Sequence, residues 1–140
     1  MQTQIRFIIL VTCLLLTFDV SDQARNKKMT RMPNGSWGGQ HIRIEIANDS
    51  AEIDYDCAHG TIDGPLRVDS RGHFSLAGKH FRERPGPIRE GEESNGQPAK
   101  YTGSIAGDKM TLTVTLKNAG EALGTYTLVH GSPGRVWKCK

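Results

Sequence analysis

Residues 100–128 read KYTGSIAGDKMTLTVTLKNAGEALGTYTL, and this stretch decides the fold. Within it, four apolar side chains alternate with threonines, namely Met110, Leu112, Val114 and Leu116. An alternation with a period of two residues is typical of a strand with one buried face and one wet face. The pattern therefore predicts a half-buried β-strand over residues 110–116.

Turn residues on both sides predict this strand's partners. A two-residue turn at Gly107-Asp108 precedes it, and a three-residue loop ending at Gly120 follows it. With these turns every inward residue meets an inward residue. The expected facing pairs are Ile105 with Met110, Gly103 with Leu112, Tyr101 with Val114, Ala99 with Leu116, Leu116 with Ala122, Val114 with Gly124 and Leu112 with Tyr126.

The preceding chain alternates in the same way, beginning with a strand over residues 40–47. Turns are predicted at Asp49-Ser50, His59-Gly60, Ser70-Arg71-Gly72 and Gly78-Lys79. They would place Cys57 opposite Ile42, and Phe81 opposite Leu76, on the inward face. His41, His73 and His80 would then face outward.

Many short strands, paired in sequence order, indicate an all-β chain with one domain. We expect eight strands and a ninth short piece over residues 135–139. A single small antiparallel up-and-down β-barrel, lipocalin-like or avidin-like in architecture, is favoured because closure removes exposed edges. Inward glycines at 64, 103 and 124 also favour a barrel. A β-sandwich is the alternative. The polar stretch 85–98 is expected to be a long loop covering one mouth.

The N-terminus predicts a secreted chain. Residues 7–18 form an apolar run after Arg6, which is typical of a signal peptide and too short for a stable membrane span. We expect a signal peptide over residues 1–22, a basic flexible leader over 23–34 and the barrel domain over 35–140. The expected location is secreted or periplasmic.

Charge argues against nucleic-acid binding. From residue 35 onward, thirteen Lys and Arg balance thirteen Asp and Glu, so the net positive charge lies in the leader. Nucleic-acid binding requires a basic patch on the folded part.

Removal of the signal peptide leaves two cysteines, Cys57 and Cys139. In an oxidising compartment they are expected to form a disulfide. Such a bond requires the C-terminal segment to cross the barrel end or to lie directly beside Cys57, because a strand two spacings away would be too far to bridge.

Two resemblances follow from these residues. The G-x-W at Gly35 to Trp37, the strand meander and Arg135 near the end are similar to the lipocalin pattern, in which an arginine packs over the tryptophan. This implies that Trp37 and Arg135 close the barrel; avidin-like barrels and small bacterial metalloprotease inhibitors share the architecture. D-C-A-H-G at residues 56–60, with the Y-x-G-x-I-x-G-x-x-M-x-L-x-V motif at residues 101–114, resembles small secreted bacterial proteins of uncharacterised function. That resemblance implies a secreted location but does not indicate an activity.

Reactive clusters are sparse. Cys57 beside His59 could form a nucleophile pair, but a structural disulfide and a turn residue explain both. The histidines do not have the sequence spacing that metal ligands usually have, so we expect no metal site. We also expect no cofactor and no catalytic residue. Glu83 falls in the inward phase at a barrel mouth, or points to water where the strand ends before Pro85.

We therefore expect a secreted, non-enzymatic β-barrel, a lipocalin-like small-ligand-binding or interaction module. The alternative is a secreted protein inhibitor or an envelope-interaction protein. The partner would be a small apolar molecule or another secreted or envelope protein. The candidate interior ligand-binding residues are Tyr55, Phe74, Phe81, Glu83, Tyr101 and Tyr126.

Overall fold

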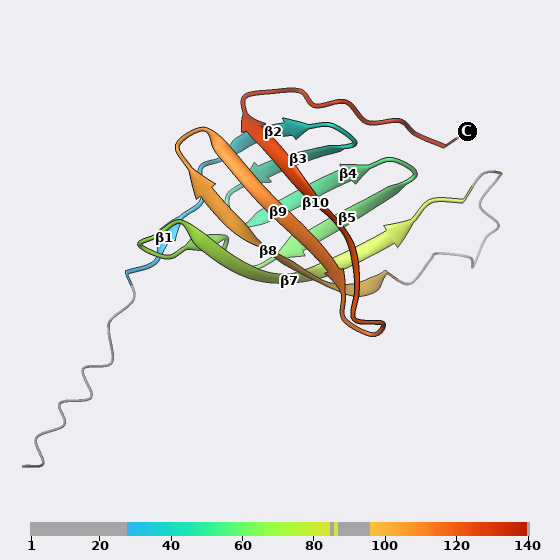
Figure 1. Cartoon of the computed structure of the whole chain (residues 1–140), viewed down its shortest axis with the longest axis horizontal. Coiled ribbons are helices and arrows are strands. Elements are labelled where there is room, and N and C mark those ends of the chain that lie inside the picture. Colours follow the sequence, from blue (N-terminus) through green and yellow to red (C-terminus); the bar gives the residue numbers. More distant parts are fainter. Residues whose placement is uncertain (1–27, 85, 87–95, 140) are drawn as a thin grey trace, which may run out of the picture.

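The computed structural model describes residues 28–84, 86 and 96–139 (Figure 1). The strands are β1 (Thr30–Arg31), β2 (Gly35–Gly39), β3 (Ile42–Ala47), β4 (Ser50–Tyr55), β5 (Ala58–Asp63), β6 (Arg67–Val68), β7 (His73–Arg82), β8 (Gln97–Ala106), β9 (Lys109–Leu116) and β10 (Glu121–His130). Eight of them close into an antiparallel barrel in the order β10-β2-β3-β4-β5-β7-β8-β9, while β1 pairs with β6. The all-β barrel prediction is confirmed, and the sandwich is excluded.

The meander β8 to β10 closely matches its prediction. All four expected facing pairs between β8 and β9 are present. Between β9 and β10, Gly124 faces Val114 and Tyr126 faces Leu112 as expected. The expected pair of Ala122 with Leu116 is wrong, since Ala122 faces Thr115. The register shifts between Ala122 and Gly124, because a β-bulge puts two residues opposite one at this point.

The turns of the β3–β4 and β4–β5 hairpins lie at other residues than predicted. The turns lie at Asn48-Asp49 and Asp56-Cys57, where Asn48 and Cys57 have left-handed φ of 57° and 55°. As a result Tyr55, and not Cys57, faces Ile42. The inward set of β3 and β4 is nevertheless correct, because each register differs from the predicted one by an even number of residues. Cys57 itself lies in a turn.

Two glycines predicted to form turns lie within strands. Gly60 is in β5, and Gly78 is in the middle of β7, which runs unbroken to Arg82. A Cβ on Gly60 would lie 2.5 Å from the Tyr101 hydroxyl, and one on Gly78 would lie 2.8 Å from the Tyr101 ring. These glycines therefore give Tyr101 room inside the barrel. The predicted number of eight barrel strands is still correct. Two predicted strands are one strand, β7, and β2 is a barrel strand that was not predicted.

An unbroken β7 reverses two predicted side-chain directions. His80 is buried and packs against Tyr55, so the expectation that it faces outward is wrong. Phe81 lies on the outer face, stacked on His59 with ring centroids 4.7 Å apart, so its predicted interior position is also wrong. Both errors follow from the turn that was predicted at Gly78.

One end of the barrel is filled by residues from outside the barrel strands. Met32, which follows β1, is 3% exposed, and Leu66, which precedes β6, is fully buried. The backbone N–H of Met32 donates to the carbonyl of Leu66 at 2.8 Å. We call this the plugged end. The folded domain therefore begins before residue 35, within the predicted leader; residues 1–27, including the predicted signal peptide, lie outside the described residues.

The opposite end carries the C-terminal segment 131–139, which we call the strap. Figure 1 shows it leaving β10 and running past β2 and β3. The predicted ninth strand over residues 135–139 is wrong. The strap pairs with the barrel in β fashion only through an isolated parallel bridge between Gln40 and Arg135. Of the predicted loop 85–98, Gln97 and Pro98 belong to β8, and residues 85 and 87–95 lie outside the described residues.

Candidate functional site

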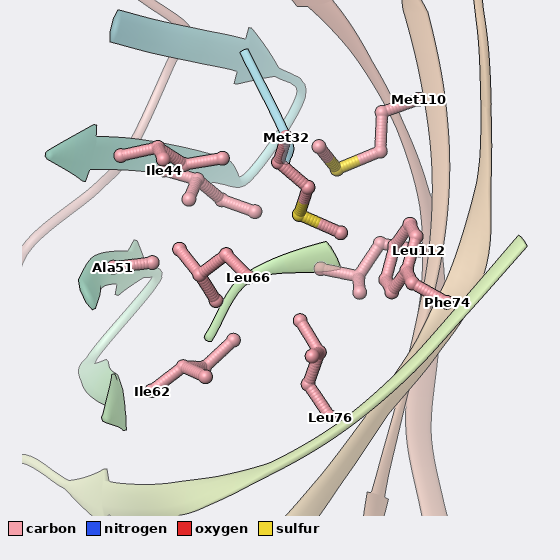
Figure 2. Close-up of a pocket in the computed structure, with 10 residues that line it drawn as sticks. Met32, Ile44, Ala51, Ile62, Leu66, Phe74, Leu76, Met110 and Leu112 are labelled. Carbon is pink, nitrogen blue, oxygen red and sulfur yellow. The ribbon is translucent and has the colours of Figure 1, made fainter. Parts of the chain in front are cut away.

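The plugged half of the interior is closely packed. Its cavity has a volume of about 10 Å³, close to the size of one water molecule. Figure 2 shows carbon and sulfur side chains converging on it from all sides. The lining residues are Met32, Ile44, Ile46, Ala51, Ile62, Leu66, Phe74, Leu76, Met110 and Leu112. This half has no room for an organic ligand.

The other half of the interior is aromatic and partly polar, and we call it the aromatic end. Tyr55 lies between His80 and Tyr126, with ring centroids 5.3 Å and 5.9 Å away. Tyr101 is fully buried, and its hydroxyl donates to the carbonyl of Lys79 at 2.8 Å. Tyr55, Tyr101 and Tyr126 thus come together as predicted, whereas His80 was missed.

Two buried polar atoms at the aromatic end have no hydrogen-bond partner within the described residues, the Tyr55 hydroxyl and Nδ1 of His80. Tyr55 is 4% exposed and His80 is 9% exposed. Burial raises the pKa of Tyr55, with smaller contributions from Tyr101 and Tyr126. Burial also lowers the pKa of His80, helped by the positive charge of Arg82 and by His59. Both groups are therefore neutral at pH 7.

The remaining predicted lining residues lie elsewhere. Phe74 is buried in the lining of the plugged half, where it faces Gly103 on β8. Glu83 follows β7 on the outside, where its carboxylate accepts a hydrogen bond from Lys138 at 2.9 Å. The predicted ligand-binding residues therefore do not form one site. Phe74 lies in the plugged half and the three tyrosines at the aromatic end, whereas Phe81 and Glu83 lie on the outer face.

Backbone hydrogen bonds and a disulfide hold the strap. The N–H of Arg135 donates to Gly39, and its carbonyl accepts from His41. The N–H of Trp137 donates to the Asp56 carboxylate at 2.7 Å, and its carbonyl accepts from the N–H of Cys57. Cys57 and Cys139 form the predicted disulfide, with Cα atoms 4.9 Å apart. The strap runs over the outer face beside β2, β3 and β4 and ends directly beside Cys57, which is one of the two courses that the disulfide allowed.

Glycine makes room for the strap on β2. A Cβ on Gly38 would lie 2.2 Å from the backbone nitrogen of Gly134. Only a residue without a side chain allows this approach. Gly38 thus allows the strap to pack directly on β2.

Trp37 lies at the seam between β2 and β10, as a barrel-closing residue should. It is fully buried, and the imidazole of His130 packs against it with ring centroids 4.6 Å apart. Arg135 is exposed, and its backbone bridges to Gln40. The residue beside the tryptophan is thus His130, which the lipocalin pattern did not indicate.

Lys138 joins the strap to the outer face of the barrel. Its ammonium lies 3.0 Å from Asp54 and 2.9 Å from Glu83, and Asp54 also accepts from Arg43 at 2.9 Å. Burial acts to raise the pKa of Asp54, but Lys138 and Arg43 together lower it. Likewise, burial acts to lower the pKa of Lys138, but the two carboxylates raise it. The strap is therefore attached by charge as well as by the disulfide.

Trp137 is the most exposed large apolar side chain of the described residues, at 68%. Its neighbours on both sides are fixed, because Arg135 is bridged to β2 and Cys139 is covalently bound to Cys57. A rigid, exposed indole is the residue type that most often dominates protein interfaces. Sequence analysis did not single out this residue.

The described residues offer no catalytic or metal arrangement that we recognise. The Cys57 sulfur is in a disulfide and is therefore not a free thiol beside His59. No three His, Cys, Asp or Glu side chains within 28–84, 86 and 96–139 lie close enough to hold a metal ion. Across the same residues, no helix is long and apolar enough to cross a membrane.

Comparison with known proteins gives no family, since no family model, curated protein or solved structure matches the chain.

Proposed function

We propose that this chain is a secreted, non-enzymatic interaction module that binds another molecule with its outer surface. The observation that carries the proposal is the close packing of the plugged half of the interior, where the apolar cavity is limited to about 10 Å³. Ligand pockets usually have volumes of roughly 300 to 1,000 Å³, far more than this barrel encloses at its plugged end. A lipocalin-like storage role would require a cavity of that size.

The binding surface in this proposal is the strap and the outer face beside it. A groove of about 350 Å³ lies between the strap and β3 and β4, lined by Arg43, Asp54, Pro133, Gly134, Val136 and Lys138. Trp137 projects nearby from a fixed backbone. A preorganised aromatic anchor reduces the ordering cost of association. The disulfide that fixes it is typical of an oxidising compartment outside the cytoplasm.

Site-specific photo-crosslinking tests this proposal in the secreting cells. A photoreactive amino acid replaces Trp137 in one variant and Thr111 in the control, because Thr111 is exposed on β9, away from the strap. We expect a discrete adduct at 137 and none at 111. Equal adducts at both positions, or none at either, would contradict a binding surface at the strap.

A second candidate function is the binding of a small hydrogen-bonding molecule at the aromatic end. The Tyr55 hydroxyl and His80 Nδ1 are the observation that favours it, because both are buried polar atoms that such a molecule could satisfy. Native mass spectrometry of the purified protein decides between the candidates. A stoichiometric copurifying molecule, lost in Tyr55→Phe, would support this second function.

A further inference from the structure

The strap has one backbone edge that the barrel does not use. Arg135 and Trp137 direct both their N–H and C=O groups toward the barrel. In an extended chain, alternate residues direct these groups to opposite edges. Val136 and Lys138 therefore direct theirs away, and within the described part of the chain no hydrogen bond engages either backbone. The barrel strands form a closed ring, so the strap brings a free strand edge to this surface.

We propose that this free edge pairs with the same edge of a second copy of the chain, which gives a two-fold symmetric dimer. The proposal rests on the outer-surface function above and names the partner. Closed two-fold dimers are the commonest oligomers, and their interface must be self-complementary.

The backbone of the edge meets this requirement. If the two straps run antiparallel with Trp137 opposite the partner's Trp137, then Val136 lies opposite the partner's Lys138. That pair exchanges two hydrogen bonds, and the symmetry-related pair exchanges two more. The unpaired N–H and C=O groups belong to Val136 and Lys138, directly before and after Trp137. This one register therefore gives each of them a hydrogen-bond partner.

The side chains are also complementary in this register. Trp137 occupies a position where cross-strand side chains are closest, so the two exposed indoles would cover each other. Arg135 lies two residues away on the same face and has no ion pair within the described residues. It can reach the partner's Trp137 on the diagonal, where a guanidinium over an indole is favourable.

Charge does not oppose the pairing. Lys138 lies on the other face of the strap, where Asp54 and Glu83 of its own chain neutralise it. The two lysines of the dimer are therefore already paired with carboxylates. An extended segment of another protein could use the same backbone edge, but it would need its own aromatic and cationic residues at matching positions.

Sedimentation velocity and tryptophan fluorescence of the purified protein over a concentration series test the dimer. Only the short segment around Trp137 takes part in the pairing, so we expect weak association with a Kd on the order of 100 µM. Trp37 is fully buried, so a concentration-dependent blue shift of the emission reports on Trp137. A protein that sediments as a monomer at concentrations well above this Kd overturns the proposal.

Val136→Pro and Val136→Ala form a matched pair of variants. Proline removes the N–H from the free edge and is compatible with an extended chain, whereas alanine keeps the edge intact. We expect Val136→Pro to lose dimerisation at least tenfold and Val136→Ala to keep it. Absence of free thiols in both variants verifies that the strap is still tied to Cys57. Equal dimerisation by the two variants overturns pairing through the backbone edge.

The crosslinking experiment separates this proposal from the proposed function. A monomeric purified protein that still yields a specific adduct of another protein at Trp137 would overturn self-pairing and support outer-surface binding. A dimeric protein whose adducts at 137 contain only this chain would support the dimer and remove the case for another partner.

Discussion

At one end of the barrel Met32 and Leu66 fill the opening with apolar side chains, whereas at the other end tyrosines line the interior and the strap is held to the outer face by ion pairs and a disulfide. The plugged end depends on hydrophobic burial, which changes little with pH or redox conditions. The aromatic end depends on a covalent bond, on ionised groups and on a buried imidazole. Sensitivity to redox conditions therefore belongs to the end that carries the candidate binding surface, whereas ionised groups lie at both ends, since Arg31 pairs with Asp49 and His73 with the buried Asp69 near the plugged end.

Removal of the disulfide should have the largest effect. The bond joins residues 82 apart in sequence, for which the chain-entropy relation gives about 4.5 kcal/mol of stabilisation. We expect Cys57→Ser with Cys139→Ser to lose most of this in urea melts. A reductant should destabilise the wild type equally and leave the double variant unchanged. Two free thiols in the denatured, unreduced wild type would contradict the bond itself.

Truncation at the plugged end should have the next largest effect. Leu66 is fully buried against Met32, so Leu66→Ala should lose about 3 kcal/mol in the free energy of unfolding. The matched control is Arg67→Ala, an exposed neighbour on β6, which should change it by less than about 0.5 kcal/mol. The loss at Leu66 should be the same at pH 7.5 and pH 5. A loss that depends on pH would show that charged neighbours such as the buried Asp69 also contribute to this end.

Acid should destabilise the aromatic end selectively. Burial and the charge of Arg82 lower the pKa of His80 in the folded state below its ordinary value of 6.5. The unfolded chain therefore binds the proton first, so stability should fall as the pH drops below about 6.5. Urea midpoints between pH 7.5 and 5 measure this. His80→Leu should flatten the profile in that window.

A second acid transition should follow at the strap. The N–H of Trp137 lowers the pKa of the Asp56 carboxyl, with help from His41 and against the effect of burial. A depressed carboxyl pKa contributes stability that is lost as the pH falls below about 3.8, the ordinary value. Asp56→Asn should weaken this second transition and leave the His80 transition in place. Fluorescence of Trp137 follows it directly.

The smallest effect should come from Tyr55→Phe. The Tyr55 hydroxyl is buried without a hydrogen-bond partner within the described residues, so its removal should be neutral or stabilise by up to about 1 kcal/mol. Tyr126→Phe is the control, since its ring is only half-buried. A clear loss of stability in Tyr55→Phe would indicate that the hydroxyl is bound in solution, which would strengthen the small-molecule candidate.

The sequence predicts the barrel well where turn chemistry and alternation agree. Between residues 99 and 116 the Gly107-Asp108 turn and the apolar alternation define the same register, and every facing pair is right. Gly60 and Gly78 misled the interpretation, because a glycine that makes room for a distant ring has the same sequence signature as a glycine in a turn. The ring it accommodates, Tyr101, lies 41 and 23 residues away.

The candidate site was only partly predictable for the same reason. Cysteine arithmetic correctly predicted the disulfide, and of the two courses it allowed, the C-terminal segment ends directly beside Cys57. The exposure of Trp137 and the role of Lys138 depend on how that segment lies against β2, β3 and β4, which no local pattern encodes. Gly38 is the one sequence signal for this packing, and it is understood only once Gly134 is seen beside it.

The pairing of β2 with β10 determines when the barrel can close during synthesis of the chain. It joins the first and last barrel strands through three facing pairs, Leu128 with Gly39, Val129 with Gly38 and His130 with Trp37. The other seven ladders join barrel strands that follow one another along the chain, with only the short β6 between β5 and β7. At about 5 to 20 residues per second, β2 must wait several seconds for β10 to be made. During that interval the closing edge of β2 is unpaired, and the nascent chain is most open to pairing with another molecule.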